Sequence, residues 1–310
     1  MNRTDNNIIY DWVSFTSKIH SVNDIVALLG MTDSIDKWEI TYGAHGYRDR
    51  LYYGGISIHY NGRTEDMGVW CEMSGQGCRT FETFGHGIFD CIFKEVMSNP
   101  EDMNITRLDV AYDDFIGILN LDVISQDVLA QNYISYLKKW CVTTSSEGTS
   151  VNIGSMKSDL FIRIYDKARE RKLDDGTHWV RFEIQLRRNR AKAFAFLDGS
   201  IGLNFFGVLN NYLRFVVPSE TDSTKSRWKT ADYWLKFLQS LQRISIFSAP
   251  GVEYNEINLE NFVFKQAGNS ISTYIECFGE NKFFDMLKKR GTAYNPKQRM
   301  LINKYKGLEV

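Results

Sequence analysis

Alternating apolar and polar residues mark three strands in the middle of the chain, and each strand carries charge on its polar side. They are Ile105–Phe115 (ITRLDVAYDDF), Phe161–Lys167 (FIRIYDK) and Trp179–Arg187 (WVRFEIQLR). Residues two apart in a strand point to the same side, so each segment is apolar on one face. If the strands share a sheet, we expect their polar faces to form one surface of carboxylates, cations and a phenol. Metal-assisted phosphoryl transfer needs such a surface.

The pattern elsewhere predicts an α+β protein in which helices flank an antiparallel sheet. Further strands are expected at Tyr52–Tyr60, Gly68–Met73, Arg79–Phe84 and Ser150–Ile153. Helices are expected at Ser21–Leu29, Ile88–Met97, Ser125–Lys139, Ala191–Leu197, Ala231–Leu241, Leu259–Gly268, Ser270–Phe278 and Asn281–Arg290. Two sheet-rich segments, 38–97 and 105–197, each run from strands into a helix, which suggests an internally duplicated sheet unit.

A polar run at Pro218–Lys229 divides the expected domains, because it is poor in apolar residues. We predict a catalytic α+β domain over residues 1–217, a linker or exposed loop over 218–230, and a helical C-terminal lobe over 231–310. A chain of 310 residues has room for one large domain or two moderate ones.

Composition narrows the class of protein. Hydrophobic residues make up 43% of the chain and charged residues 24%, as in ordinary globular proteins. The net charge of −1 gives no basic field over the whole molecule, so nucleic-acid binding would have to come from local patches. The cysteines form no CxxC pair, no apolar run reaches the ~18–20 residues of a membrane span, and the N-terminus is too polar for a signal peptide. We therefore expect a cytoplasmic protein with reduced thiols and no membrane partner.

Asp109 and Glu183 are the best pair of metal-ligand candidates, because each sits mid-strand two residues after an arginine. A hard cation such as Mg²⁺ or Mn²⁺ is satisfied by one or two carboxylates together with water and a phosphate oxygen. Asp113 shares the face of Asp109 about 13 Å further along the strand and is expected at the rim of the site. The alternative is that these acids pair with neighbouring arginines on a solvated face.

Tyr165 is the candidate nucleophile. On its strand face it lies between Arg163 and Lys167, and the loop Gly154–Asp159 precedes its strand. A free phenol has a pKa of about 10, and nearby cations favour the phenolate. The same cations would stabilise charge that develops on a scissile phosphate. The alternative is a tyrosine with a purely structural role.

Other motifs carry weaker signals. The five histidines are scattered and form no HxH or HExxH pair, so packing accounts for them better than metal binding. The glycine-rich run Ser74–Arg79 matches no Walker or dinucleotide fingerprint, and we interpret it as a tight turn between strands.

Four ordered motifs resemble the replication initiation factor family of rolling-circle replication. That family includes plasmid and filamentous-phage initiators and the relaxases of integrative conjugative elements. The motifs are MSGQGCR at 73–79, TRLDVAYDD at 106–114, FIRIYDKARE at 161–170 and VRFEIQLRR at 180–188. The later runs YWLKFL and FGENKFFDMLKKRG also look like the phage and conjugative-element branch.

The resemblance implies an enzyme that nicks and rejoins one DNA strand at a specific sequence. The tyrosine of the RIYDK motif, Tyr165 here, would attack a phosphodiester, keep the 5′-phosphate as a covalent phosphotyrosine and free a 3′-hydroxyl. Asp109 and Glu183 would position a divalent metal on the scissile phosphate. Basic side chains near the tyrosine would contact that phosphate, namely Arg163, Lys167 and Arg181. Further contacts with DNA are expected from Arg107, Arg169, Arg187 and Arg79.

The partners implied by the resemblance are origin DNA, as a supercoiled duplex or a single-stranded hairpin, and a host helicase. The protein is expected to act as a monomer or a homodimer. No separate helix-turn-helix precedes the catalytic region, so origin recognition is expected from the domain itself or from a partner.

Two alternatives stay open from the sequence. One is a protein of the same fold that binds an origin without cutting it. The other is a two-carboxylate hydrolase of sugars that uses Asp109 and Glu183. Such a hydrolase would need neither a metal nor Tyr165, which separates it from the nicking enzyme.

Overall fold

The computed structural model divides the chain into two compact units, Met1–Ser248 and Ala249–Val310, and each is described by itself. The residues that it describes are 8–146, 148–173, 176–238 and 268–289, with positions 259, 263–264, 301–302 and 305–306.

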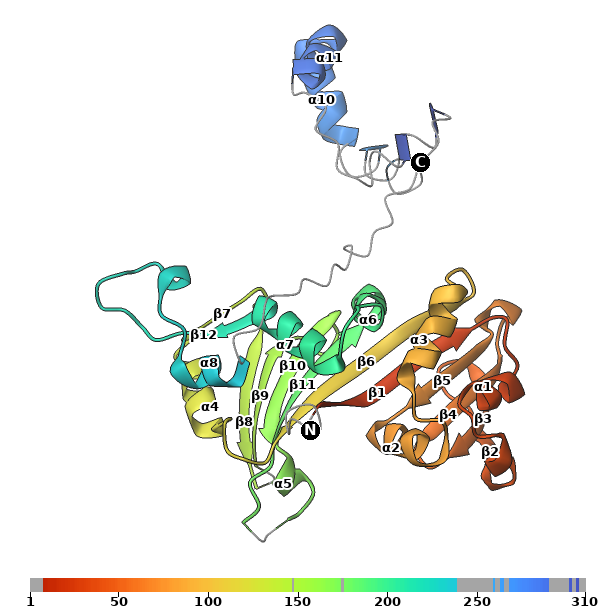
Figure 1. Ribbon diagram of the computed structural model, residues 1–310. Helices are drawn as coiled ribbons and strands as arrows, with labels where there is room; N and C mark the ends of the chain where they lie inside the picture. The colour runs from red at the N-terminus through yellow and green to blue at the C-terminus, as the bar shows by residue number, and fades with distance from the viewer. Residues whose placement is uncertain are drawn as a thin grey trace. The chain divides into compact units, whose positions relative to one another are not determined.

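The first unit is built on a ten-stranded antiparallel sheet with the strand order β2-β3-β4-β5-β1-β6-β11-β10-β9-β8 (Figure 1). Its strands are β1 (Ile8–Ser17), β2 (Glu39–Tyr42), β3 (Tyr47–Tyr53), β4 (Ile56–Gly62), β5 (Val69–Met73), β6 (Met103–Asp114), β8 (Trp140–Ser145), β9 (Gly148–Gly154), β10 (Leu160–Asp166) and β11 (Val180–Arg187). The predicted α+β class is confirmed. The three charged strands are the neighbours β6, β11 and β10.

Helices and a small ribbon complete this unit. The α-helices are α1 (Val22–Leu28), α2 (Gly75–Phe84), α3 (Phe89–Ser98), α4 (Leu121–Leu129), α5 (Lys167–Glu170), α6 (Arg188–Ala195), α7 (Ile201–Tyr212) and α8 (Asp232–Leu238). Short 3₁₀-helices are η2 (Thr32–Lys37), η3 (Glu65–Met67) and η4 (Lys225–Arg227). The ribbon pairs β7 (Tyr133–Ser135) with β12 (Leu213–Phe215).

The apolar side of the sheet is packed by helices in both of its halves. Tyr112 of β6 contacts Phe206 of α7 and Phe237 of α8, with ring centroids 5.8 and 5.1 Å apart. Tyr10 of β1 contacts Phe89 of α3 at 4.7 Å. Because β1 and β6 pair so that Tyr10 and Tyr112 point the same way, the helices of both halves cover one face. The polar residues of the strands occupy the opposite face.

The ten strands are two repeats of one five-stranded plan. The first repeat has the order β1-β5-β4-β3-β2 and the second β6-β11-β10-β9-β8, and the antiparallel pair β1 and β6 joins them. The topology therefore contains the duplication suggested by the sequence, but the first repeat begins at Ile8 rather than at residue 38. The strand β1 shows no clean alternation because consecutive residues Val13, Ser14 and Phe15 are all buried.

The register makes the repeat visible in the sequence. Ile56–Tyr60 (ISIHY) of β4 takes the place of Ile162–Asp166 (IRIYD) of β10. Val69–Met73 (VWCEM) of β5 takes the place of Val180–Ile184 (VRFEI) of β11. Without the register the two hairpins are hard to align, because their polar positions carry different residues.

The glycine-rich motif begins a helix and does not form the predicted turn between strands. Residues 79–84, expected as a strand, belong to α2. Ser74 caps this helix, since its hydroxyl accepts a hydrogen bond from the Gly77 amide at 3.4 Å. Gly77 also packs against the backbone just before β4, where a Cβ would lie 2.2 Å from the Gly55 carbonyl oxygen. The glycines therefore allow close packing of helix on sheet.

The helix expected at residues 125–139 is shorter and lies earlier in the chain. It is α4, which ends at Leu129. Gln131 then adopts a left-handed backbone with φ of 58°, which stops the helix and turns the chain into β7.

The predicted boundary between catalytic domain and helical lobe is wrong. Trp234 and Phe237 of α8 are 0% and 1% exposed and pack into the core of the first unit, so residues 231–238 belong there. The run 218–230 is no linker between domains, because Arg214 donates hydrogen bonds to the carbonyls of Ser226 and Trp228. The division of the chain falls at Ser248 instead.

The described part of the second unit is helical, as predicted. It contains α10 (Gly268–Phe278) and α11 (Glu280–Lys289), separated at Gly279 with a φ of 83°. Tyr274 of α10 contacts Phe283 of α11, with ring centroids 6.1 Å apart. The predicted helix over residues 259–268 lies mostly outside the described residues. Among the helices that the structure describes, none has the length and apolar character needed to cross a bilayer.

Candidate active site

The polar faces of β6, β11 and β10 form one surface, as the sequence predicts. The register sets Asp113 opposite Arg181, Arg163 opposite Glu183, and Tyr165 opposite Arg181. Directly paired residues point to the same side of a sheet, so these side chains gather on the face opposite to the one that α3, α7 and α8 pack against. The three charged strands lie next to one another inside the sheet, so their charged side chains are buried against each other.

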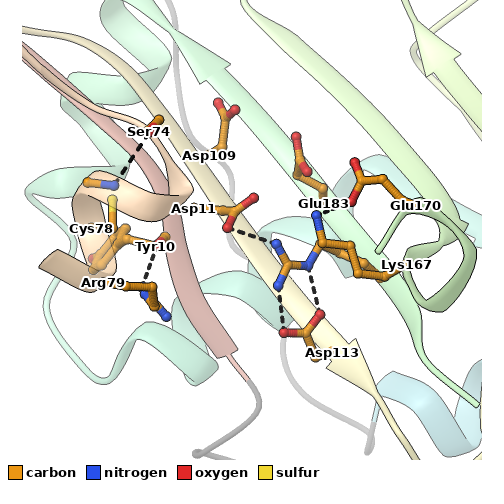
Figure 2. A network of polar contacts seen from close by, with 12 residues as sticks. Tyr10, Asp11, Ser74, Cys78, Arg79, Asp109, Asp113, Lys167, Glu170 and Glu183 are labelled. Carbon is orange, nitrogen blue, oxygen red and sulfur yellow. Dashed lines mark hydrogen bonds and ion pairs between the residues drawn. The ribbon is translucent and has the colours of Figure 1, made fainter. Parts of the chain in front are cut away.

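Arg181 lies between two aspartates at the centre of this surface. Its Nε and Nη2 each donate to a different oxygen of Asp113 at 2.7 Å, and its Nη1 lies 2.7 Å from Oδ1 of Asp11 (Figure 2). Trp179 also donates from Nε1 to Asp113 at 2.7 Å. The Arg181 residue is only 3% exposed. All three of its guanidinium nitrogens already contact carboxylates. Its contact with phosphate stays a prediction.

Asp113 is placed with Arg181 rather than with Asp109. Both of its oxygens accept hydrogen bonds from the guanidinium, and it is 7% exposed. A carboxylate that is held in this bidentate way is satisfied without a metal. Asp113 therefore needs no metal to satisfy its charge, and its place at the rim of a metal site stays a prediction.

Asp109 and Glu183 are buried acids that repel each other. Burial raises the pKa of Glu183 to about 7, and the charges of Asp109 and Asp11 add to this rise. Burial also raises the pKa of Asp109, although hydrogen bonds from Arg107 and Gln185 oppose the rise. Two buried acids whose charges repel each other suit a cation.

A divalent cation would fit these two acids in part. Among the described residues, no three His, Cys, Asp or Glu side chains form a group that could hold a metal ion. A cation here would take Glu183 and Asp109 and complete its shell with water and phosphate oxygens, as Mg²⁺ commonly does. Arg107 already binds Asp109, with its Nε 2.9 Å from Oδ1, so Glu183 has the less encumbered carboxylate.

Tyr165 lies within hydrogen-bond reach of a carboxylate and an ammonium group. Its hydroxyl donates to Oε2 of Glu183 at 3.4 Å and accepts from Nζ of Lys167 at 3.3 Å. The guanidinium of Arg163 lies over its ring, 4.1 Å from the centroid. Lys167 is itself buried and paired with Glu170.

The expectation that nearby cations would favour the phenolate is wrong for the protein alone. Burial and the charge of Glu183 raise the pKa of Tyr165 well above its ordinary value, and Arg181 only partly opposes them. The phenol is therefore neutral at rest and needs a proton acceptor in contact with it. Glu183 is in that position.

The predicted DNA-contacting arginines separate into two groups. Arg107, Arg169 and Arg187 line a cleft of about 1450 Å³, together with Tyr165, Glu183 and Arg163. Arg79 does not line it: its Nη2 donates to the Tyr10 carbonyl and to Glu82, both at 2.8 Å. Arg79 is thus placed to hold β1 against α2, away from the cleft.

Sequence reasoning missed Asp11. It is the one charged residue in the strand Ile8–Ser17 and sits at a bulge, where the register with β6 shifts between Tyr10 and Trp12. A lone acid in a strand that is otherwise uncharged was the available signal. The mixed pattern of β1 hid it, because the strand itself was not recognised.

Comparisons with known proteins agree with this architecture. Residues 103–289 match the family described as replication initiation factor, and residues 7–88 match the N-terminal domain of rolling circle replication initiation proteins. The chain is 25% identical over 316 residues to the inferred DNA relaxase NicK of Bacillus subtilis, covering 94% of this chain and 88% of the relative. A rolling circle replication initiator protein from Geobacillus stearothermophilus has a similar solved structure, with a TM-score of 0.67 and 28% identity. That match covers 78% of this chain and 99% of the other.

Proposed function

Because the chain belongs to the replication initiation factor family, we propose that it nicks and rejoins one strand of origin DNA through a covalent bond to Tyr165. The observation that carries the proposal is the position of the Tyr165 hydroxyl. It lies on a polar sheet face, lines a large cleft and contacts both Glu183 and Lys167. A nucleophile in contact with a carboxylate that can accept its proton and with an ammonium that can stabilise charge is the arrangement expected for nucleophilic catalysis.

The proposed reaction follows from these contacts. Glu183 accepts the phenolic proton as the Tyr165 oxygen attacks phosphorus. The bond from phosphorus to the 3′-oxygen breaks, and the proton passes to that oxygen to give a free 3′-hydroxyl. The 5′-phosphate stays on Tyr165, and the reverse sequence rejoins the strand. Lys167 and Arg163 stabilise the negative charge on the non-bridging oxygens.

Asp109 and Glu183 would hold the proposed Mg²⁺ or Mn²⁺. When bound, such an ion supplies Lewis-acid stabilisation of the scissile phosphate. The protein's own contribution is to bury two acids side by side, so that their charge favours a cation. Arg107 limits that charge by binding Asp109.

The cleft gives the DNA strand its proposed path. The guanidinium of Arg163 lies over the ring of Tyr165, where we propose that it binds phosphate. Arg107, Arg169 and Arg187 extend the basic lining away from Tyr165. We propose supercoiled or hairpin origin DNA as the substrate and a host helicase as the partner that opens the duplex, which places the reaction in the cytoplasm.

A gel assay with supercoiled origin DNA and Mg²⁺ or Mn²⁺ tests the proposal, followed by mass spectrometry of the protein. A nicked product with a nucleotide adduct on Tyr165 would support it. Binding without nicking would favour the protein that recognises an origin without cutting. Cleavage of a glycoside that survives both chelation and loss of Tyr165 would favour the two-carboxylate hydrolase.

A further inference from the structure

Asp11 of the first repeat contributes a carboxylate to the site on the second repeat. Asp11 of β1 contacts Nη1 of Arg181 at 2.7 Å, on the side away from the bidentate contact with Asp113 (Figure 2). Its side chain is 20% exposed, while that of Arg181 is 4% exposed. The acid thus meets Arg181 at the edge of the polar face and not in open solvent.

The position of Asp11 is built by the glycine-rich motif. The bulge in β1 falls between Tyr10 and Trp12, and Arg79 of α2 holds it by donating to the Tyr10 carbonyl at 2.8 Å. Gly75, the first residue of α2, leaves room for the acid: a Cβ at this position would lie 2.7 Å from Asp11 Oδ1. A bulge redirects a side chain next to a site, and here it redirects a carboxylate.

Arg181 has a third acid, Glu183, within its electrostatic reach, besides Asp11 and Asp113. Its charge acts on both Glu183 and Tyr165, which lie on the same face. A guanidinium with a free Nη1 would be drawn to the excess negative charge at Glu183. Asp11 occupies that nitrogen, so Oε2 of Glu183 stays available to the Tyr165 hydroxyl.

We propose that Asp11 is a positioning residue of the nicking reaction, which acts by holding Arg181 against Asp113 and away from Glu183. This inference rests on the proposed function, because it assumes that Glu183 serves Tyr165. It gives the first repeat a role in the chemistry, and it gives the motif MSGQGCR the task of placing Asp11.

The test is the variant Asp11→Asn, which keeps the shape and removes the charge. The turnover rate of adduct formation on an origin oligonucleotide should fall by roughly 10- to 100-fold, as for a misplaced catalytic group. The KM and the affinity for the same oligonucleotide should stay within about twofold, since Asp11 contributes no DNA contact. Asp49→Asn is the matched control, because Asp49 also pairs with an arginine in the first repeat.

A second variant tests whether the position of the Asp11 carboxylate matters, apart from any effect on folding. Gly75→Ala keeps Asp11 but crowds its carboxylate, and it should also slow adduct formation at unchanged oligonucleotide affinity. Gly268→Ala, the same change at the first residue of α10, should leave the rate as it is, because its Cβ meets nothing closer than 3.5 Å. Thermal melting of each variant reports folding.

The outcomes distinguish the inference from the function on which it rests. Wild-type protein without a Tyr165 adduct would overturn the proposed function. Wild-type nicking together with Asp11→Asn nicking at the same rate would overturn only the role of Asp11. If Asp11→Asn fails to fold, Gly75→Ala decides: slowed turnover at the wild-type melting temperature supports the role, and unchanged turnover overturns it.

Discussion

The two repeats of the sheet share a topology and one pair of positions, yet only one of them carries the proposed chemistry. On the alignment of their hairpins, His59 takes the place of Tyr165 and Glu72 that of Glu183. Even the contact is kept: His59 Nε2 lies 3.4 Å from Glu72 Oε1, and the Tyr165 hydroxyl lies 3.4 Å from Glu183 Oε2.

The difference lies in what surrounds each pair. Arg163 and Arg181 of the second repeat are replaced by Ser57 and Trp70 in the first. His59 is 1% exposed and stacks on Trp70, with ring centroids 4.6 Å apart and planes within 18°. Arg50 lies opposite His59 in the register, so a cation is present, but an imidazole that is covered in this way cannot take up a phosphate. The comparison teaches that the fold supplies two equivalent places, and the cations and cleft make one of them a site.

The test with the largest expected effect replaces each of the two equivalent residues, Tyr165 and His59, by phenylalanine. Tyr165→Phe removes the attacking oxygen and should abolish adduct formation while oligonucleotide binding persists. His59→Phe should keep nicking within about twofold and cost roughly 1–3 kcal/mol of stability, since it removes buried polar contacts. Nicking by Tyr165→Phe, or its loss in His59→Phe, would contradict the assignment of the two repeats.

The second test concerns the paired acids. Glu183→Gln removes the proton acceptor and should lower the rate of adduct formation by about 10²- to 10⁴-fold, the usual size of general-base effects. Glu72→Gln is the matched change in the first repeat and should alter the rate by less than about threefold. Single-turnover kinetics with a labelled oligonucleotide measures both. Equal losses in the two variants would show that the pair of His59 and Glu72 also takes part in the reaction.

The third test uses pH and leaves activity aside. Burial and the charges of Asp109 and Asp11 raise the pKa of Glu183 to about 7, above the ~4.3 of an unfolded glutamate, so the folded state loses stability as pH rises through this window. Glu183→Gln should therefore be more stable than wild type by about 3 kcal/mol at pH 8, with the gain vanishing near pH 4. Urea unfolding in the presence of a chelator measures this gain. A difference that does not change with pH would contradict it.

The smallest expected effect concerns the cation that only the second repeat carries. Arg163→Ala should weaken oligonucleotide binding by about 1–3 kcal/mol and lower the salt slope by about one. Ser57→Ala at the equivalent place should change neither quantity. Binding titrations at several salt concentrations give both numbers. An unchanged salt slope in Arg163→Ala would mean that this guanidinium does not contact phosphate.

The sequence predicted the second repeat well because its pattern is regular. Strands β6, β10 and β11 alternate in the stretches around Asp109, Tyr165 and Glu183, so the faces that hold these residues could be assigned from period alone. The first repeat was harder, since β1 is buried on both faces and α2 begins with glycines that favour turns. Side-chain pairing also escaped prediction. The bidentate contact between Arg181 and Asp113 depends on register, which residue order along one strand does not specify.

The central pair of β1 and β6 makes each repeat protect the edge strand of the other. Each repeat on its own would leave its innermost strand as an edge strand with unpaired backbone N–H and C=O groups. For β6 this edge would be 12 residues long and open to pairing with another chain. Joined edge to edge, the halves leave only β2 and β8 at the margins of the sheet. The first half is therefore needed to cover the edge of β6, even where it supplies no nucleophile of its own.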